Sequence, residues 1–489
     1  MMLQRATSTN KPLIIFHLSS RKTMSKFRGN LMKTIRMHLY FLLFIAVFLS
    51  FPLIPSFADD QNIPLPEPLS MSEAIHIALE QNPEIKAAGF QMDAVKSNTT
   101  KARSGFYPQL NFSQSFNRTT NPMWAFGTKL NQATITQEDF DPARLNDPDA
   151  INNFTSNFSV SWSVFEGGRT KLGLEQAKQH LSVASLALER TRQNVISQTA
   201  KAYVGLVLAQ KNIMVTKEAL ETSKANLKMI QSRYNSGFVV KSDLLRANVH
   251  VADLEQQWLL SESQFKIREA MLNTSMGSGT AYPLNPVTPL SIGSELSGTI
   301  DNWIVTALSK RPEIKNLRLE EEIAKKEVEK SRTGHYPDLN LVGNYEINSE
   351  DFSDSADNYT IGAVMQINLF SGNRITEETK AAKSLLKRVQ EIQKSTELGI
   401  KVQVREAFLK AKCARKMIGV AKTAADQAEE GLRIVKNRYN NGLLTIIDLL
   451  DAELAHQQAR TNYFKALHDY KVARVDLELA AGIIDKDFQ

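Results

Sequence analysis

The chain has 489 residues, enough for two or three ordinary domains, and a formal net charge of +7. Residues 1–58 hold eight basic side chains and no acidic one, whereas the remainder holds 51 basic and 52 acidic side chains. The positive balance therefore belongs to the leader and does not indicate a nucleic-acid partner. The single cysteine, Cys413, excludes a disulfide within one chain.

Residues 1–58 have the layout of a secretory signal peptide. A basic segment ends at Arg36, an apolar run extends from Leu39 to Phe51, and Ser56-Phe57-Ala58 then supplies the small residues that a signal peptidase reads. An uncleaved membrane anchor is the alternative, but the apolar run is short for a membrane span. We therefore predict that the mature chain is exported.

The mature sequence predicts two copies of one structural repeat. The first copy covers residues 59–276, the second covers 299–489, and a Gly-, Pro- and Ser-rich linker at 277–298 joins them. A Pro-Glu-Ile-Lys motif and a Tyr-Pro motif recur at an offset of 229 residues, and a Phe-x-Gly-x-Arg motif recurs at 205. Since the offset falls only between the strands of each copy, the first copy has the longer loop.

Each copy is predicted to begin with short helices that stop at prolines and to continue as strands. Period-two alternation places strands at 109–117, 154–165, 338–348 and 359–370. Residues 118–153 are predicted to form a polar loop between the first two strands. One face of the strands is apolar, with aromatic side chains at Phe112, Phe116, Phe158, Trp162, Tyr345 and Tyr359. We predict that these side chains face lipid, although a half-buried soluble sheet shows the same alternation.

A very long helix is predicted between the last strand of each copy and a tip glycine, Gly237 or Gly442. Each helix has about 67 residues, or roughly 100 Å, and a stripe spaced four and three residues apart predicts left-handed coiled-coil packing. Asn-Ser-Gly and Asn-Asn-Gly suit a helix end, so each tip is predicted to join the long helix to a return helix. A coiled-coil scaffold would explain these helices equally well, but it would not explain the strands.

Four strands cannot close a barrel, and an open sheet edge is not tolerated in lipid. About eight strands are the practical minimum for closure, so the barrel is predicted to be shared between chains. Two chains would supply eight strands and three would supply twelve, and strand spacing alone does not choose between them.

Over about residues 68–483 the sequence resembles the TolC-like outer-membrane efflux protein family. The resemblance is carried by the duplication, both tip motifs, Asn82-Pro-Glu, the run from Ala102 to Leu110, and the run from Phe165 to Arg169. It implies a mainly α fold with a small β part: long antiparallel coiled-coil helices form a periplasmic α-barrel, and a homotrimer shares a twelve-strand outer-membrane β-barrel. The implied function is a channel-tunnel that exports small molecules or proteins, in multidrug efflux or type I secretion. The implied partners are a periplasmic adaptor and an inner-membrane pump of the RND or ABC type.

The resemblance also points to a constriction at the periplasmic tips, formed by Tyr439, Asp448 and Asp451 with Asp243 from the first copy. Three-fold symmetry would turn Asp448 and Asp451 into rings of carboxylates, which select cations and whose crowding raises some pKa values. A helix start explains Asp448 as well, because it completes a near capping box; Asp451 is harder to explain in this way. Leu444 stands where the family often has an arginine. If that arginine locks the closed state through Asp243, this chain lacks the lock, and closure depends more on Tyr439 and the apolar tips.

The tips are also predicted to contact the adaptor, through Gly237, Phe238, Gly442 and Leu443. Exposed apolar side chains without a partner are unfavourable, and packing on the neighbouring hairpin is the alternative explanation. Arg233 and Arg438 lie in the last turns of the long helices, where complementing the helix dipole is enough to explain them.

The sequence predicts neither an enzyme nor a bound cofactor or metal. Histidines are scattered, and HExxH, CxxC, GxSxG and P-loop motifs are missing from the sequence. A passive porin would need many strands and short turns, whereas most of this chain is predicted helix. A secreted coiled-coil scaffold is the other alternative, and it would be soluble without detergent.

Overall fold

The computed structural model describes residues 68–279, 282–292 and 296–485, so the predicted signal peptide at 1–58 lies outside the described residues. Every described element belongs to one compact unit, Pro64–Gln489. The elements of the first repeat are α2 (Met71–Gln81), α3 (Pro83–Arg103), β1 (Gln109–Thr119), α4 (Pro122–Asn131), α5 (Pro142–Asn146), β2 (Ile151–Glu166), α6 (Arg169–Asn235) and α7 (Lys241–Met276). The elements of the second are α8 (Ile300–Lys310), α9 (Pro312–Arg332), β3 (Asp338–Ser349), β4 (Ala356–Gln366), α10 (Arg374–Asn440) and α11 (Ile446–Ala481).

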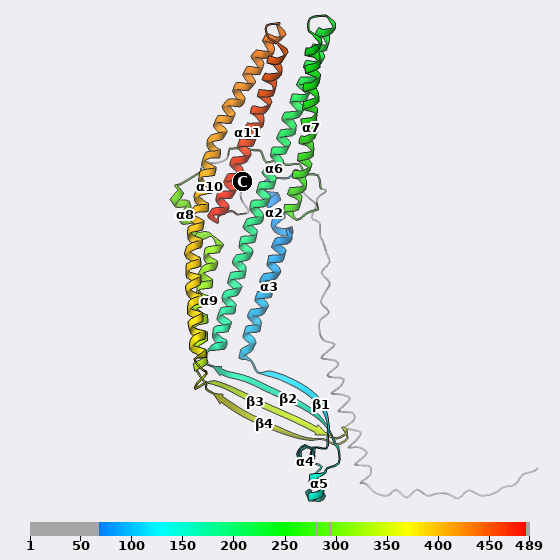
Figure 1. Cartoon of the computed structure of the whole chain (residues 1–489), viewed down its shortest axis with the longest axis vertical. Coiled ribbons are helices and arrows are strands. Elements are labelled where there is room, and N and C mark those ends of the chain that lie inside the picture. The colour runs from blue at the N-terminus through cyan, green and yellow to red at the C-terminus, as the bar shows by residue number, and fades with distance from the viewer. Residues whose placement is uncertain (1–67, 280–281, 293–295, 486–489) are drawn as a thin grey trace, which may run out of the picture. The chain divides into compact units, whose positions relative to one another are not determined.

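The two repeats have the same lengths of helix in the same order. The long helices α6 and α10 each contain 67 residues, and the return helices α7 and α11 each contain 36. Gly237 and Gly442 follow the long helices with φ angles of 77° and 75°, the left-handed conformation that a helix end favours. The tips of both hairpins therefore lie at the end of the helices remote from the sheet (Figure 1).

The four strands form one antiparallel sheet in the order β1-β2-β3-β4. Within the first repeat Leu110 pairs with Val160, and at the repeat offsets Leu339 pairs with Met365 in the second. The pairing of β2 with β3, which places Phe158 opposite Tyr345, joins the two repeats. The sequence duplication is thus a duplication of strand register as well.

Two predicted segments need correction. The strand predicted at 359–370 is wrong at both ends, because β4 starts at Ala356 and stops at Gln366. The apolar alternation does continue to Leu369, but Gln366 already pairs with Asp338, the first residue of β3, so later residues have no partner strand. The segment at 118–153 is not a plain loop: β1 extends to Thr119, β2 starts at Ile151, and α4 and α5 lie between them.

Proline starts these two short helices. Pro122 and Pro142 occupy the first helical turn, and Asn121 and Asp141 accept hydrogen bonds from the turn's backbone amides. An Asn-Pro or Asp-Pro pair therefore marks a helix start as readily as a turn. Both pairs lie in the segment that was predicted to be a polar loop, so the two helix starts were not predicted.

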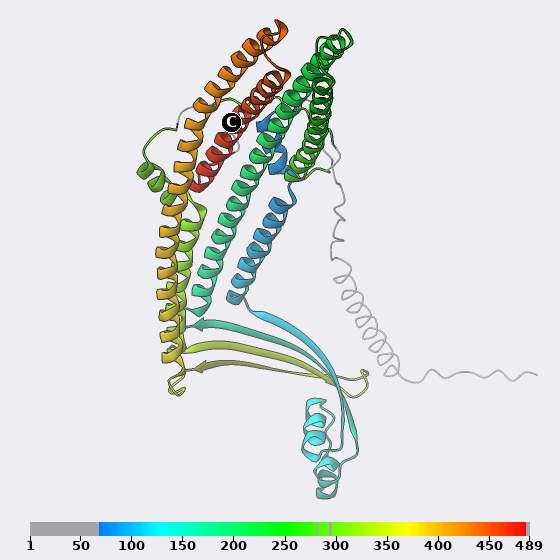
Figure 2. The ribbon, with the colours of Figure 1, turned by 45° about the horizontal axis from the view of Figure 1, so that its top comes forward.

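The helices pack side by side within each repeat and between repeats. α3 lies against α6, α9 lies against α10, and α6 also contacts α9 and α11 (Figure 2). Side chains from α2, the middle of α6 and the end of α7 form one apolar core, and α10 with α11 forms another. Among the described helices, none combines the length and the apolarity needed to cross a membrane.

Candidate functional site

The two hairpin tips of one chain pack on each other through an apolar cluster. Its buried members come from both hairpins: Ile230, Leu244, Ala247, Tyr439, Ile446 and Leu449. Leu444, at which the family resemblance implied a missing arginine lock, is partly buried against the same cluster. Leu444 therefore contributes apolar packing between the hairpins and cannot form the ion pair with Asp243 that an arginine would provide.

Tyr439 is the aromatic centre of this contact and is only 4% exposed. The Arg233 guanidinium lies 5.2 Å from the centre of its ring, and the Tyr439 hydroxyl has no hydrogen-bond partner among the described residues. Burial raises the pKa of Tyr439, and the nearby Asp243 carboxylate acts in the same direction while Arg233 opposes it. Tyr439 thus lies between the two hairpins of its own chain.

Arg233 has a different role from the one predicted. Its Nη2 donates to the carbonyl oxygen of Asn440 at 3.0 Å and its Nη1 donates to that of Tyr439 at 3.4 Å, so it caps the end of α10 rather than its own helix. Arg438, its counterpart in the second repeat, stays exposed at its own helix end. The sequence could not distinguish them, because the difference arises from a contact between the two copies.

Asp448 is held by the start of α11. Its Oδ2 accepts from the Thr445 hydroxyl at 2.6 Å and from the Thr445 amide at 2.8 Å, which completes the capping box. These hydrogen bonds lower the pKa of Asp448 within one chain. Asp451 lies one turn further along and is exposed, and Asp243 is half-buried at the start of α7. Crowding of Asp448 and Asp451 into rings would need further copies of the chain.

The two residues predicted to meet an adaptor are free in the single chain. Phe238 is 82% exposed and Leu443 is 71% exposed. A Cβ built on Gly237 or Gly442 would meet no atom within 4 Å, so both tips are open to a partner.

At the other end of the helices, the sheet has one apolar and one polar face. Phe112, Phe158, Tyr345 and Tyr359 lie directly opposite one another across all four strands, and all are exposed. Phe116 and Trp162 are exposed on the same face. The opposite face carries mainly serine, threonine and asparagine side chains. This is the pattern of a sheet that separates lipid from an aqueous interior.

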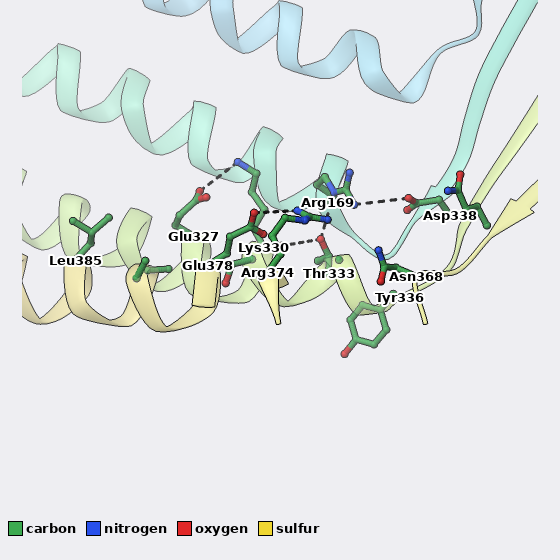
Figure 3. A pocket seen from close by; sticks show the side chains of 15 residues that line it. Arg169, Glu327, Lys330, Thr333, Tyr336, Asp338, Asn368, Arg374, Glu378 and Leu385 are labelled. Carbon is green, nitrogen blue, oxygen red and sulfur yellow. Dashed lines mark hydrogen bonds and ion pairs between the residues drawn. The ribbon is translucent and has the colours of Figure 1, made fainter. Parts of the chain in front are cut away.

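The arginines of the two Phe-x-Gly-x-Arg motifs line a pocket of about 640 Å³ at the junction of helices and sheet (Figure 3). Arg169 and Arg374 begin α6 and α10, where a positive charge opposes the helix dipole. Carboxylates offset this: Arg169 lies 3.8 Å from Asp338, and Arg374 lies 3.0 Å from Glu378. The motif was visible in the sequence, but the pairing with Asp338 was not.

In the first copy of the motif, the surroundings of Gly167 leave no room for a side chain. Its φ angle is 61°, and a Cβ there would lie 2.7 Å from the Cβ of Tyr336. A side chain would therefore push the strand-to-helix turn away from the Tyr-Pro motif.

Within the described residues, no group of three or more His, Cys, Asp or Glu side chains could hold a metal ion.

Residues 74–278 and 303–483 match the family described as Outer membrane efflux protein. The chain belongs to this family. Alkaline protease secretion protein AprF of Pseudomonas aeruginosa is 24% identical over 443 residues, which cover 86% of this chain and 85% of AprF. Outer membrane protein TolC of Salmonella enteritidis is 21% identical over 421 residues, which cover 83% of this chain and 80% of TolC.

Solved structures show the same fold. The Campylobacter jejuni CmeC outer membrane channel superimposes with a TM-score of 0.72 at 19% identity, covering 89% of this chain and 92% of CmeC. The Vibrio cholerae outer membrane protein VceC superimposes with a TM-score of 0.68 at 18% identity, covering 84% of this chain and 96% of VceC. The predicted fold class is confirmed, and this outer membrane efflux protein is a channel of the outer membrane whose helical part lies in the periplasm. Its family is one of channels and not of enzymes.

Proposed function

We propose that this efflux protein is a homotrimeric channel-tunnel that exports small molecules or proteins, taking its energy from a pump and doing no bond chemistry itself. The observation that carries the proposal is the junction between the two repeats. That junction is a template for the contact between one chain and the next. The trimer itself is supported by the family resemblance, since three chains supply twelve strands.

The strands give the first half of the template. β2 and β3 pair although they belong to different repeats, while β1 and β4 are the unpaired edges of the sheet. At the repeat offsets, β4 corresponds to β2 and β1 corresponds to β3. The pair Phe158–Tyr345 then predicts that Ala363 lies opposite Phe116 of the next chain. Such pairing would give hydrogen-bond partners to the free backbone groups of β1 and β4 and would close the barrel.

The helices give the second half. Ion pairs join α6 to α11 across the repeat junction, Glu218 with Arg460 at 2.7 Å and Lys201 with Asp476. The same offset maps this contact onto α10 of one chain and α7 of the next. Both helices leave apolar side chains exposed in the single chain, namely Leu409, Met417 and Val420 on α10 and Val249, Leu260 and Met271 on α7. A second copy is the partner that would cover both faces.

The native cysteine offers a direct test. Leu208 lies level with about Asp469 in the α6–α11 register set by the two ion pairs, and these positions correspond to Cys413 and Gln264. Gln264→Cys is therefore expected to form disulfides with Cys413 of the next chain, giving a covalent trimer on denaturing gels. Cys413→Ser in the same background is the control. Dimers alone, longer ladders, or no product from membrane-inserted protein would contradict the proposal.

The tips are proposed to serve docking and closure. Phe238 and Leu443, with Gly237 and Gly442, would contact a periplasmic adaptor, which in turn joins an inner-membrane pump of the RND or ABC type. In-cell photocrosslinking from Leu443 is expected to capture a periplasmic protein anchored at the inner membrane. Crosslinks only to this chain itself would favour packing between hairpins instead.

The constriction is proposed at the same end. Asp448 and Asp451 from three chains would form two rings of carboxylates, with Tyr439 packed between the hairpins behind them and Asp243 at the start of α7 as the member from the first repeat. A multivalent cation added on the periplasmic side is then expected to block the channel in a planar bilayer, because carboxylate rings attract cations. Block that persists in Asp448→Asn and Asp451→Asn variants would contradict this assignment.

A further inference from the structure

We infer that a depression centred on Gly343, on the apolar face of the sheet, binds an acyl chain of an inner-leaflet phospholipid. The inference rests on the proposed barrel, which places this face against lipid. It goes beyond general lipid contact, because it assigns one retained chain to one place on each protomer.

The depression has a volume of about 460 Å³ and spans β2, β3 and β4. Its walls include four large side chains, Phe158, Trp162, Tyr345 and Tyr359. Gly343 lies on the same face, between its neighbours Val160 on β2 and Ile361 on β4. The missing side chain therefore leaves a hollow in the middle of an otherwise raised row, and no charged residue lines it.

The backbone does not require a glycine at this position. A Cβ on Gly343 would meet only the carbonyl oxygen of Thr360, at 3.9 Å, and the residue is not among those with positive φ. The irregularity in the sheet lies elsewhere, between Ser163 and Phe165.

The equivalent position in the first repeat also shows that the strand does not require a glycine here. The residue that corresponds to Gly343 at the offset of 229 is Gln114, whose side chain hydrogen-bonds the hydroxyl of Ser156 on the neighbouring strand. The duplicated strand register thus accepts a long side chain in one copy and has none in the other. A glycine in a strand interior weakens the strand, and close approach of a ligand is one reason for its presence.

The two ends of the depression differ in polarity and indicate from which side the chain enters. Toward the loop end of the strands, the Tyr345 hydroxyl donates to Asp357 at 3.2 Å, and this carboxylate disfavours a lipid phosphate. Toward the helix end, Trp162 and Leu341 continue the apolar wall. From Asp338 at the periplasmic end to Gly343 is roughly 17 Å along the strand, about 12 Å in depth for a strand tilted by about 45°. A chain from the inner leaflet reaches that depth, since half the hydrocarbon core is roughly 15 Å.

Phospholipid retained by the detergent-purified trimer tests the site. Native mass spectrometry with lipid extraction is expected to find about one phospholipid per protomer in the wild type, and roughly tenfold less in Gly343→Leu, where the new side chain fills the hollow. Ser156→Leu is the matched control, because it adds a leucine to the same face on an inner strand, outside the lining and away from the proposed seam between chains. Equal retention in all three proteins, equal loss in both variants, or retention of lipopolysaccharide instead of phospholipid would overturn the inference.

A second measurement separates this inference from the barrel itself. In a variant whose only tryptophan is Trp162, fluorescence in bilayers containing dibrominated phosphatidylcholine reports contact of this face with acyl chains. Quenching is expected whether or not position 343 is filled. If Trp162 is quenched but no lipid is retained, the acyl-chain site fails and the barrel stands; if Trp162 is not quenched, the proposed barrel fails.

Discussion

The junction between the two hairpins of one chain differs from the equivalent positions that would face the next chain. Within the chain, buried polar groups bridge the hairpins: Asn226 of α6 donates to Glu453 of α11, and His250 of α7 lies 3.5 Å from the other Glu453 oxygen. The corresponding residues in the other copy are Gly431, Asn248 and Ala455, none of which can be charged.

This asymmetry has a mechanical consequence. A buried polar cluster is costly to open, because each separated group is left without a partner. Gly431 and Ala455, at the equivalent places, have no polar side chain that would lose a partner when neighbouring chains separate. In the proposed trimer, the two hairpins of one chain would therefore be held together more firmly than neighbouring chains are. In a closed ring of three chains, movement would concentrate at the junctions between chains.

The largest effect is expected from Glu453→Ala, which removes the centre of the buried cluster. Asn226 would lose its hydrogen-bond acceptor and His250 its neighbouring carboxylate, and we expect the free energy that holds the two hairpins together to fall by roughly 2–3 kcal/mol. Single-channel recording should show a several-fold higher open probability. Asn248→Ala, at the corresponding position, should change it little. Similar increases in open probability from both variants would show that the two junctions are equally stable.

Arg233→Ala is expected to have the next largest effect, about 1–2 kcal/mol, because the carbonyl groups at the end of α10 lose their donor from the other hairpin. Limited proteolysis at the tip of α10 and α11 should become faster. Arg438→Ala removes an exposed charge at the corresponding position and should leave the rate close to that of the wild type. Faster cleavage in both variants would show that the hydrogen bonds from Arg233 to the end of α10 have no special effect on the tip.

The same comparison shows what the sequence could and could not provide. Helix ends at Gly237 and Gly442, the break at Asn82, and the existence of four strands follow from local signals and from duplication, which is itself visible in the sequence. The role of Arg233 and the cluster around Glu453 depend on how one copy sits against the other. No local rule predicts that Asn226 and Glu453 meet, because their counterparts in the other copy are different residues. The end of β4 was missed for a similar reason, since it is set by where its partner β3 begins.

A smaller effect concerns the loops, since only the first repeat carries the ordered segment with α4 and α5. There the Lys129 ammonium, 2.6 Å from Asp139, together with hydrogen bonds from the Thr136 amide and hydroxyl, lowers the pKa of that carboxyl to about 2, below its usual 3.8. Because the pKa is lowered in the folded state, the stabilisation is present above pH 3.8 and is lost as the pH falls toward 2. Trp124 emission should report this transition, and Lys129→Met should weaken it, because only the hydrogen bonds from Thr136 would still lower the pKa of Asp139. An identical acid profile in Lys129→Met would assign the transition to other groups.

The smallest effect is expected from Asp243→Ala. Asp243 forms no ion pair within the described residues, and Leu444 packs in the apolar cluster of the hairpin tips. Removing the carboxylate should therefore leave the open probability in planar bilayers near that of the wild type, whereas Tyr439→Ala should raise it by opening a cavity between the hairpins. A large rise in Asp243→Ala would show that this carboxylate holds a lock. The partner of that lock would then have to come from the next chain, which would make the junction between chains the firmer of the two.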